Sequence, residues 1–585
     1  MIFLPIAPKY FRLGKKGETV KKFPLWLRTF LCGLCLAIPL SLDGKAPAIA
    51  AFLAFFAGIP ALYFLFGDIL GERTLGYRQY LYRGFFFAYG FHIGVYQWFV
   101  SLYPLDFIAD FSPFEAIGVV CVAWFGLSLV AAACYAFIYP TFALVARLSF
   151  PRRHKLLLPP LFAAVYTVFS FLISLTWAGV PWGNLAISQT AHPYLIGTAS
   201  LFGSYLTTFI VILTNGLLAL ALLLFLRTQK SERRFTTVRA PIFLAVGIFL
   251  LNTLTGAVLS HVPHEKEGTL TVLLLQGNVS SRDKWRDDGE SLYDRYERIL
   301  RESLAEADAA GRYPDLVVWT ETALLTTFSN PNEPPSATVR ALSSLSAELK
   351  VDNLVGAFSE HETADGEIKR YNSLFLFRQD GTVSETVYHK RRPVPFGEFT
   401  PWKPLIRAFF PFMEDLVISD ELSAGEDSAV FFEEYGSLGA LICFDSIYEN
   451  LARDAVADGA EALLISTNDS WFGTSVALDN HHSQAILRAV ENGRDVARAG
   501  NTGISSVISR RGEVRSTLEV MREGYLVGEI AFYGDMTLYT RVGNLFLLLC
   551  ALFYFGCACP DFYAWLSQKN KKSENGSLSA DGDIL

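Results

Sequence analysis

The sequence predicts an α-helical membrane bundle of eight transmembrane helices, with one α/β domain inserted before the last helix. Three observations support this fold class. Hydrophobic residues make up 51% of the chain and the mean hydropathy is +0.30, which is high for a protein that is soluble throughout. Charged residues gather between residues 262 and 535. Eight apolar stretches outside that segment are close to the ~20 residues that a helix needs to cross a bilayer.

Seven apolar stretches precede the polar segment and one follows it. They centre on residues 26–43, 47–67, 83–103, 114–146, 157–177, 194–226, 239–260 and 542–566. The two longest predict a tilt or a kink. Buried helices of a soluble core are the alternative, but eight such stretches favour a membrane. The predicted divisions are a membrane domain at 1–261, an extracytoplasmic domain at 262–535, a last transmembrane helix at 536–568 and a polar cytoplasmic tail at 569–585.

The lysines and arginines of the loops predict the orientation. They occur in the N-terminal segment, after the second, fourth and sixth stretches, and in the C-terminal tail, whereas "AGVPWGNLAISQTAHP" has none. Because cytoplasmic loops are the basic ones, both termini should be cytoplasmic and the polar segment should lie outside the inner membrane. The first stretch lacks a small-residue cleavage site, so we expect a retained helix. The net charge is -7, so the chain lacks the overall positive charge that is typical of proteins that bind nucleic acid.

This topology sets one cysteine apart. Cys443 is in the polar segment, while the other seven cysteines lie in or at the ends of the apolar stretches. Exported domains usually pair their cysteines, and Cys443 has no partner within its segment. Such a thiol is either a buried small hydrophobe or a group retained for its chemistry.

The polar segment alternates strand-like and helix-like runs. Buried strands are predicted at 269–278 and 315–321, and "SLGALICF", "SIYENLARDAVADGA" and "EALLISTND" predict a strand–helix–strand unit. Amphipathic helices are predicted at 288–311 and 334–350, and a final helix at 481–500. This alternation is typical of a layered α/β domain, in which functional residues cluster at strand ends.

Three chemically active side chains stand where predicted strands end. Glu321 ends "VVWTE", Lys390 ends "TVYHK" and Cys443 ends "LGALIC". The carboxylate can take the thiol proton, and the thiolate is then the nucleophile. The ammonium can stabilise an oxyanion together with the backbone N–H of Phe444. Each residue alone also has a structural interpretation, as a buried hydrophobe, a helix cap or a solvated cation. Their conjunction favours a catalytic site.

Five blocks of sequence, in order, carry a resemblance to a known family. They are "WTE", "HKRRPVPFGEFTP", "ICFDS", "NDSWFG" and "RAVENGRDVARAGNTGIS". The polar segment resembles the nitrilase (carbon–nitrogen hydrolase) superfamily, which implies a Glu–Lys–Cys triad on an αββα sandwich. With seven apolar stretches before this segment and one after it, residues 20–567 resemble the apolipoprotein N-acyltransferases of the bacterial inner membrane. The membrane half matches mainly in layout and in "GVPWGNLA".

The resemblance implies roles for individual residues. Glu321 is the expected general base, Lys390 the oxyanion and orientation residue, and Cys443 the nucleophile. Further residues expected near the substrate are Glu398, Phe444, Asp445, Trp285, Asn468 and Trp471. Phe444 and Asp445 replace the Tyr and Glu that are common in the family, so a role for a tyrosine hydroxyl or a longer carboxylate is in doubt. The tryptophans could instead be core aromatics, and Asn468 a turn former.

The implied reaction is acyl transfer through a Cys443 thioester. The donor is a membrane phospholipid, and the acceptor is the α-amine of the diacylglyceryl-cysteine of an apolipoprotein. The sequence has no metal-ligand spacing and no phosphate-binding glycine loop, so we expect no cofactor and no metal. We also expect a monomer. A membrane-tethered amidase or nitrilase with the same triad is the alternative. A transporter or scaffold is disfavoured, because the apolar stretches contain few charges.

The segment "FTPWKPLIRAFFPFMEDL" (399–416) is too apolar for an ordinary exposed loop. We interpret it as a mobile arm that dips into the lipid or lines the entry, with Trp402, Phe409, Phe410 and Phe412 facing lipid. A packed core extension is the alternative. Replacing Phe409 and Phe410 with Ser should slow turnover of a lipid substrate more than that of a short-chain soluble ester, since only the lipid must pass the arm. Equal losses with both substrates would remove the arm hypothesis.

Overall fold

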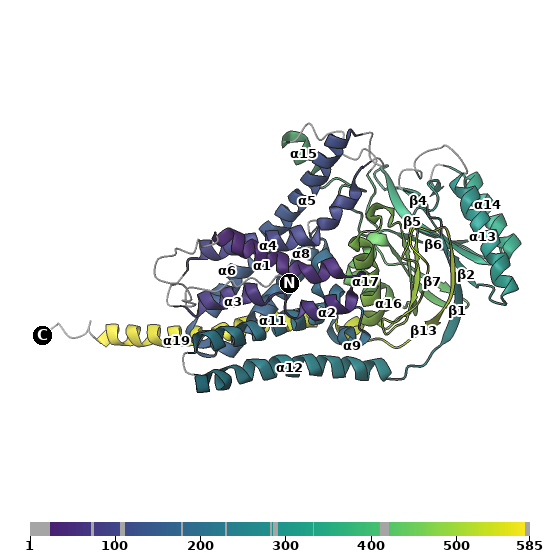
Figure 1. Cartoon of the computed structure of the whole chain (residues 1–585). Coiled ribbons are helices and arrows are strands. Elements are labelled where there is room, and N and C mark those ends of the chain that lie inside the picture. The colour runs from purple at the N-terminus through teal and green to yellow at the C-terminus, as the bar shows by residue number, and fades with distance from the viewer. Residues whose placement is uncertain are drawn as a thin grey trace, which may run out of the picture.

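The computed structural model describes residues 24–71, 75–105, 111–176, 179–228, 231–280, 284, 291–330, 333–409 and 421–578. Figure 1 shows two parts that lie end to end, a bundle of helices and a layered α/β domain. The chain enters the domain through helix α12 (Ser231–His261) and returns to the bundle in helix α19 (Leu545–Leu578).

The apolar stretches form the helices of the bundle. Besides α12 and α19 these are α1 (Leu25–Leu42), α2 (Pro47–Ala54), α3 (Ile59–Ile69), α4 (Tyr77–Val95), α5 (Pro113–Tyr135), α6 (Ile138–Ala146), α7 (Ser149–Arg153), α8 (Leu158–Ser174), α9 (Pro193–Ile196), α10 (Ala199–Phe202) and α11 (Ser204–Arg227). Seven helical stretches among the described residues are long and apolar enough to cross a membrane: Leu25–Leu42, Pro47–Ile69, Pro113–Ala146, Lys155–Ser174, Ser204–Arg227, Phe235–His261 and Leu545–Lys569. The long stretch predicted at 114–146 is interrupted between α5 and α6, while the predicted tilt or kink stays a prediction.

The predicted stretch at 83–103 becomes helix α4 and the short 3-10 helix η1 (Gln97–Leu102). Helix α4 contains Arg78, Arg83 and His92, and it is not among the seven apolar helices. It packs against α1 and α5. Seven helical stretches among the described residues thus qualify as spans by length and apolar composition, and the count of eight, with α4 as the remaining span, stays a prediction.

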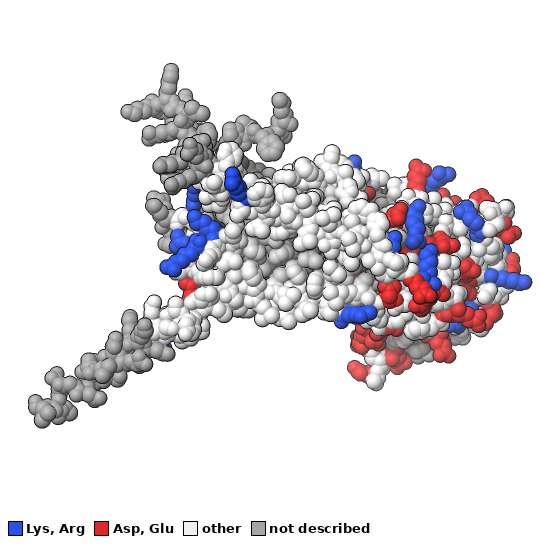
Figure 2. Space-filling view, turned by 90° about the horizontal axis from the view of Figure 1, so that it is seen from below, with Lys and Arg blue, Asp and Glu red and all other residues white. Residues whose placement is uncertain are grey.

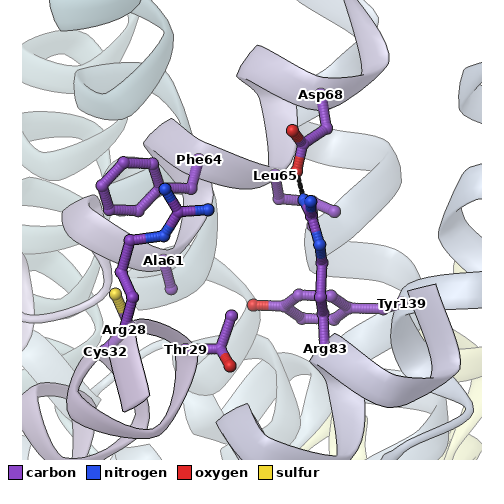
Figure 3. A pocket seen from close by; sticks show the side chains of 9 residues that line it. All are labelled: Arg28, Thr29, Cys32, Ala61, Phe64, Leu65, Asp68, Arg83 and Tyr139. Atoms are coloured by element: carbon purple, nitrogen blue, oxygen red, sulfur yellow. Dashed lines mark ion pairs between the residues drawn. The ribbon is translucent and has the colours of Figure 1, made fainter. Parts of the chain in front are cut away.

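Arg83 is paired inside the bundle. Its guanidinium forms an ion pair with Asp68 of α3, while Arg28 of α1 lies over the ring of Phe64 at 4.1 Å. Figure 3 shows these side chains, with Tyr139, around a cavity of about 10 Å³. This volume is near the lower limit for one water molecule, so the cavity is a packing gap.

The α/β domain contains two sheets. The first has the order β13-β1-β2-β4-β5-β6, with β3 paired to β4, and the second has the order β12-β11-β10-β9-β8-β7. The strands of the first are β1 (Gly268–Gln276), β2 (Leu316–Val318), β3 (Thr327–Ser329), β4 (Asp352–Glu362), β5 (Ile368–Phe377), β6 (Val383–His389) and β13 (Gly524–Phe532). Those of the second are β7 (Val430–Glu433), β8 (Gly436–Ile442), β9 (Ala462–Thr467), β10 (Val496–Gly500), β11 (Ser506–Ile508) and β12 (Val514–Thr517).

Alternating side chains explain the layers. In β1, Val272 and Leu274 belong to the core between the two sheets, whereas Leu273 and Leu275 pack toward the helices outside. Helices α13 (Leu292–Ala309) and α14 (Ala337–Leu349) cover the first sheet, and α16 (Glu449–Ala457) and α17 (Val476–Asn492) cover the second. The domain is an αββα sandwich.

Helix α17 lies between the second sheet and the bundle. All its residues except Asp479 are buried, and one apolar core runs from strands of the second sheet through α16 and α17 into the membrane helices. The Ser483 hydroxyl donates to the Asp43 carboxylate at 2.9 Å, and the Ser204 backbone N–H donates to Glu491 at 2.7 Å. Helix α17 therefore belongs to both parts.

The structure corrects one predicted helix. Helix α17 ends at Asn492, and Val496–Gly500 form strand β10, so the helix predicted at 481–500 was wrong at its end. Gly493 stops the helix, because its φ of +63° lies in the left-handed region, which glycine adopts without strain.

The core between the sheets provides a stability prediction. Leu464 of β9 is 1% exposed within it, so Leu464→Ala should cost ~2–5 kcal/mol and lower the melting temperature of the purified protein in detergent. Leu254→Ala on α12 is the control, since Leu254 is 63% exposed on a membrane helix. Equal melting temperatures for the two variants would contradict the sandwich core.

Candidate active site

Three strand ends contribute to one buried site. Glu321 follows β2 by three residues, Lys390 directly follows β6, and Cys443 directly follows β8. These residues are 5%, 2% and 8% exposed. The charges of Glu321 and Lys390 both act on the Cys443 thiol. The structure thus brings the three residues together, while their chemical roles stay predictions.

Lys390 lies between two carboxylates. Its Nζ donates to Glu321 Oε1 at 2.8 Å and to the Glu398 carboxylate at 2.9 Å. The side-chain amide of Asn372 bridges the same two acids, with its Nδ2 at 2.8 Å from Glu321 and 3.1 Å from Glu398. Burial opposes the charge of Lys390, but the two carboxylates outweigh burial and raise its pKa well above the usual value. Lys390 is therefore a fixed ammonium.

Glu321 is held ionised. Besides Lys390 and Asn372, it accepts a hydrogen bond from the backbone N–H of Asn468 at 2.8 Å. Burial alone would raise its pKa, yet the charge and hydrogen bond of Lys390, with the charge of Lys284, lower it below the ordinary value. The carboxylate is consequently able to accept a proton.

Cys443 begins the 3-10 helix η7 (Cys443–Ile447) with a left-handed φ of +47°. Burial raises the pKa of the Cys443 thiol well above its usual value and the charge of Glu321 adds to this, whereas Lys390 opposes it. The thiol is therefore protonated at rest. It needs a base at the moment of attack, and Glu321 is the nearby group that can serve.

Asp445 joins two parts of the site. Its carboxylate accepts hydrogen bonds from Tyr388 Oη at 2.8 Å and from the backbone N–H of Arg392 at 2.7 Å. It also accepts from the backbone N–H of Ile442 at 3.3 Å. Burial raises the pKa of Asp445 to about 6. The short carboxylate thus links the segment after Lys390 to the end of β8.

The other predicted residues have different surroundings. Phe444 packs its ring against Tyr448, with centroids 5.5 Å apart, and Asn468 Oδ1 accepts from Asn501 at 2.9 Å. Trp471 is partly buried in the short helix η8 (Ser470–Phe472), and Trp402 is 61% exposed. Trp285, Phe410, Phe412 and the side chain of Phe409 lie outside the described residues.

Sequence reasoning missed two polar residues of the site. Asn372 lies within strand β5, in "NSLFLF", and was not among the predicted site residues. Lys284 is buried, and its Nζ donates to the Glu321 carbonyl at 3.2 Å and to Thr322 Oγ1 at 2.6 Å. Burial lowers the pKa of Lys284 to about 8. The signal for Lys284 was its place within "QGNVSSRDKW", beside the predicted Trp285.

One group of side chains has the composition of a metal site. Ligand atoms of Cys443, Asp469 and His481 lie within 4.8 Å of one another. Asp469, however, accepts from the Arg498 guanidinium at 2.6 Å and lies 2.8 Å from His481 Nδ1. The guanidinium supplies the positive charge that a cation would, so the residues fit a metal ion poorly.

Comparisons with known proteins identify both parts. The carbon–nitrogen hydrolase family model matches residues 274–533, and the apolipoprotein N-acyltransferase N-terminal domain model matches residues 44–217. The apolipoprotein N-acyltransferase of Geobacter metallireducens is 33% identical over 375 residues, which cover 64% of this chain and 68% of that protein. That of Pseudomonas syringae pv. tomato is 29% identical over 497 residues, which cover 84% and 90%. Among solved structures, Saccharomyces cerevisiae Nit3, a member of branch 10 of the nitrilase superfamily, is 22% identical with a TM-score of 0.35, covering 46% of this chain and 93% of that chain.

The position of Lys390 between two acids predicts the effect of Glu398→Gln. One of the carboxylates that raise the pKa of Lys390 is lost, so this pKa should fall and the alkaline limb of the kcat/KM profile should move to lower pH. Loss of one charge-assisted hydrogen bond, worth ~1.5–3 kcal/mol, should also reduce the rate by roughly tenfold or more. Glu385→Gln, at an exposed position of β6, is the control. An unchanged profile would show that Glu398 does not hold the lysine.

Proposed function

Because the chain belongs to the apolipoprotein N-acyltransferase family, we propose that Cys443, Glu321 and Lys390 transfer an acyl chain from a membrane phospholipid to an apolipoprotein. The chain is an acyltransferase of lipoprotein N-acylation and a multi-pass protein of the bacterial inner membrane. The acceptor is the free α-amino group of the diacylglyceryl-cysteine. The observation that supports this proposal best is the buried Glu321–Lys390 pair, which acts on a protonated Cys443 in a domain packed onto the bundle.

The first half-reaction forms a thioester. Glu321 takes the proton from Cys443 Sγ, and the thiolate attacks the carbonyl carbon of the phospholipid ester. Lys390 Nζ and the backbone N–H of Phe444 stabilise the oxyanion of the tetrahedral intermediate. When the intermediate collapses, the C–O bond breaks and the departing alkoxide receives the proton from Glu321. The products are the acyl-enzyme and a lysophospholipid.

The second half-reaction forms the amide. The α-amine of the apolipoprotein attacks the thioester carbon, and Glu321 accepts the amine proton. The C–S bond then breaks, and the thiolate recovers its proton from Glu321. Water would compete for the same thioester, so its exclusion matters, and the burial of all three side chains supports such exclusion.

We also propose the orientation and the division of the chain. On the face that Figure 2 shows, the bundle has a broad uncharged band, with Lys and Arg at the end remote from the α/β domain and mixed charges over that domain. This pattern supports a cytoplasmic side for the basic end and a periplasmic side for residues 262–535. Residues 1–261 and 536–568 are then the membrane part, 569–585 the cytoplasmic tail, and the protein acts as a monomer.

The exposed Trp402 supports the proposed lipid-facing arm. It directly precedes helix α15 (Lys403–Phe409), which Figure 1 shows near one end of α5. A large aromatic side chain at that place is suited to contact acyl chains at the membrane surface.

Mass spectrometry tests the mechanism directly. Wild-type protein incubated with phosphatidylethanolamine and no acceptor should carry an acyl mass on the Cys443 peptide, and an amine acceptor should remove it faster than water does. Cys443→Ser should lose turnover while keeping its melting temperature, and Glu321→Gln should reduce acylation by roughly 10²–10⁴-fold, as expected for a general base. A fully active Cys443→Ala variant would contradict the proposal. If water removes the acyl group from Cys443 faster than the amine does, an amidase-type hydrolase is favoured.

A further inference from the structure

The backbone carbonyl of Cys443 contacts two side chains. Its oxygen accepts from Ser446 Oγ at 2.7 Å, and His481 Nε2 lies 3.2 Å from this oxygen and 3.2 Å from Ser446 Oγ. The φ of +47° at Cys443 is unfavourable for a residue with a side chain and persists only where surrounding contacts impose it. Since this carbonyl belongs to the residue whose thiol must reach the substrate, the Ser446 and His481 side chains help to fix the direction of the nucleophile.

His481 is itself held by charged groups. Its Nδ1 donates to Asp469 Oδ1 at 2.8 Å, and Asp469 Oδ2 accepts from Arg498 at 2.6 Å. All three residues are at most 1% exposed. Burial opposes the charge of Asp469, but Arg498 and His481 hold the pKa of this carboxyl well below its usual range. With Nδ1 at Asp469 and Nε2 beside the Cys443 carbonyl and Ser446 Oγ, the imidazole ring is fixed at two points.

Aromatic residues of both parts surround the other side of His481. Its ring lies 5.7 Å from Trp182 of the membrane part and 5.8 Å from Phe472 of η8, between centroids. Trp182 belongs to the short helix η3 (Pro181–Gly183) before α11, and Trp98 of η1 packs on both Trp182 and Phe472. Trp182 of the bundle therefore lies beside the residue that supports Cys443.

Helix α17, which carries His481, is fixed to the same part of the bundle. Gln484 Nε2 donates to the Pro181 carbonyl at 3.2 Å, one residue before Trp182. Ser483 joins Asp43 and also accepts from Thr190 Oγ1 at 3.0 Å. A shift of these segments would move α17, and with it the imidazole that contacts the Cys443 carbonyl.

We infer that His481 is a positioning residue, through which the membrane part sets the direction of the Cys443 thiol. The inference rests on the proposed function only in taking Cys443 as the nucleophile. His481 does not touch the substrate; it acts through the backbone of Cys443. The α/β domain is accordingly incomplete as a catalyst without the loops of the bundle that contain Trp98 and Trp182.

The test uses full-length protein in lipid nanodiscs. His481→Gln removes the double contact, while His482→Gln is a matched control, because His482 is buried on the same helix but bonds to Ser506 instead. The readouts are kcat and KM with phosphatidylethanolamine, the rate of iodoacetamide alkylation of Cys443 measured on its peptide, and the melting temperature.

We expect His481→Gln to lower kcat roughly 10- to 100-fold with KM changed less than about twofold, as for a misplaced reacting group. Alkylation of Cys443 should change in rate as well, whereas His482→Gln should leave both rates near the wild-type values. Trp182→Leu should shift both rates in the same direction as His481→Gln, by a smaller factor. Trp182→Leu therefore still tests the inference if His481→Gln does not fold.

Wild-type kcat and alkylation in His481→Gln, or equal losses in both histidine variants, would overturn the inference. If His481→Gln changes kcat and the alkylation rate but Trp182→Leu changes neither, the membrane part has no role in positioning the thiol. Failure of the proposed function is recognised separately, because Cys443→Ala would then stay active while the alkylation rate still reports the position of the thiol.

Discussion

The burial of Lys390 between Glu321 and Glu398 is the interaction on which the site depends. A buried ammonium is costly unless it is paired and hydrogen-bonded, and here each partner comes from a different segment. Glu321 follows β2, Asn372 belongs to β5, and Glu398 lies in the loop after Lys390. The need to satisfy one charge therefore fixes the relative position of three segments. The same contacts hold Glu321 ionised beside a thiol that burial keeps protonated.

A second constraint comes from helix α17, which has no solvent-facing side. Buried polar groups need hydrogen-bond partners, and those of α17 find them in two directions. His481 and His482 bond toward the second sheet, while Ser483, Gln484 and Glu491 bond toward loops and helix ends of the bundle. The α/β layers and the membrane helices thus share helix α17, which fixes the position of Cys443 relative to the bundle.

Much of the fold could be predicted from the sequence because local patterns encode it. Long apolar stretches marked the membrane helices, and short apolar runs marked the buried strands β1 and β8. The end of α17 was missed, since the sequence after Gly493 contains polar residues that only a buried strand in the second sheet explains. Because α4 contains arginines, it also stays undecided whether this helix crosses the membrane. Lys284 and Asn372 could not be found, because their contacts with Glu321 and Thr322 join positions far apart in the chain, and no local periodicity records such pairs.

The free thiol has a consequence for oxidative chemistry. Cys443 is the one cysteine of the α/β segment, and the other seven lie in the membrane part or at its edges. A sulfenic acid formed at Cys443 would find no second thiol in the α/β segment with which to form a disulfide, so its reduction through a disulfide would need an external thiol. Oxidants react with the thiolate rather than with the thiol. If Cys443 is the nucleophile and lies on the periplasmic side, as proposed, the burial that raises the pKa of its thiol also protects it from oxidants between turnovers.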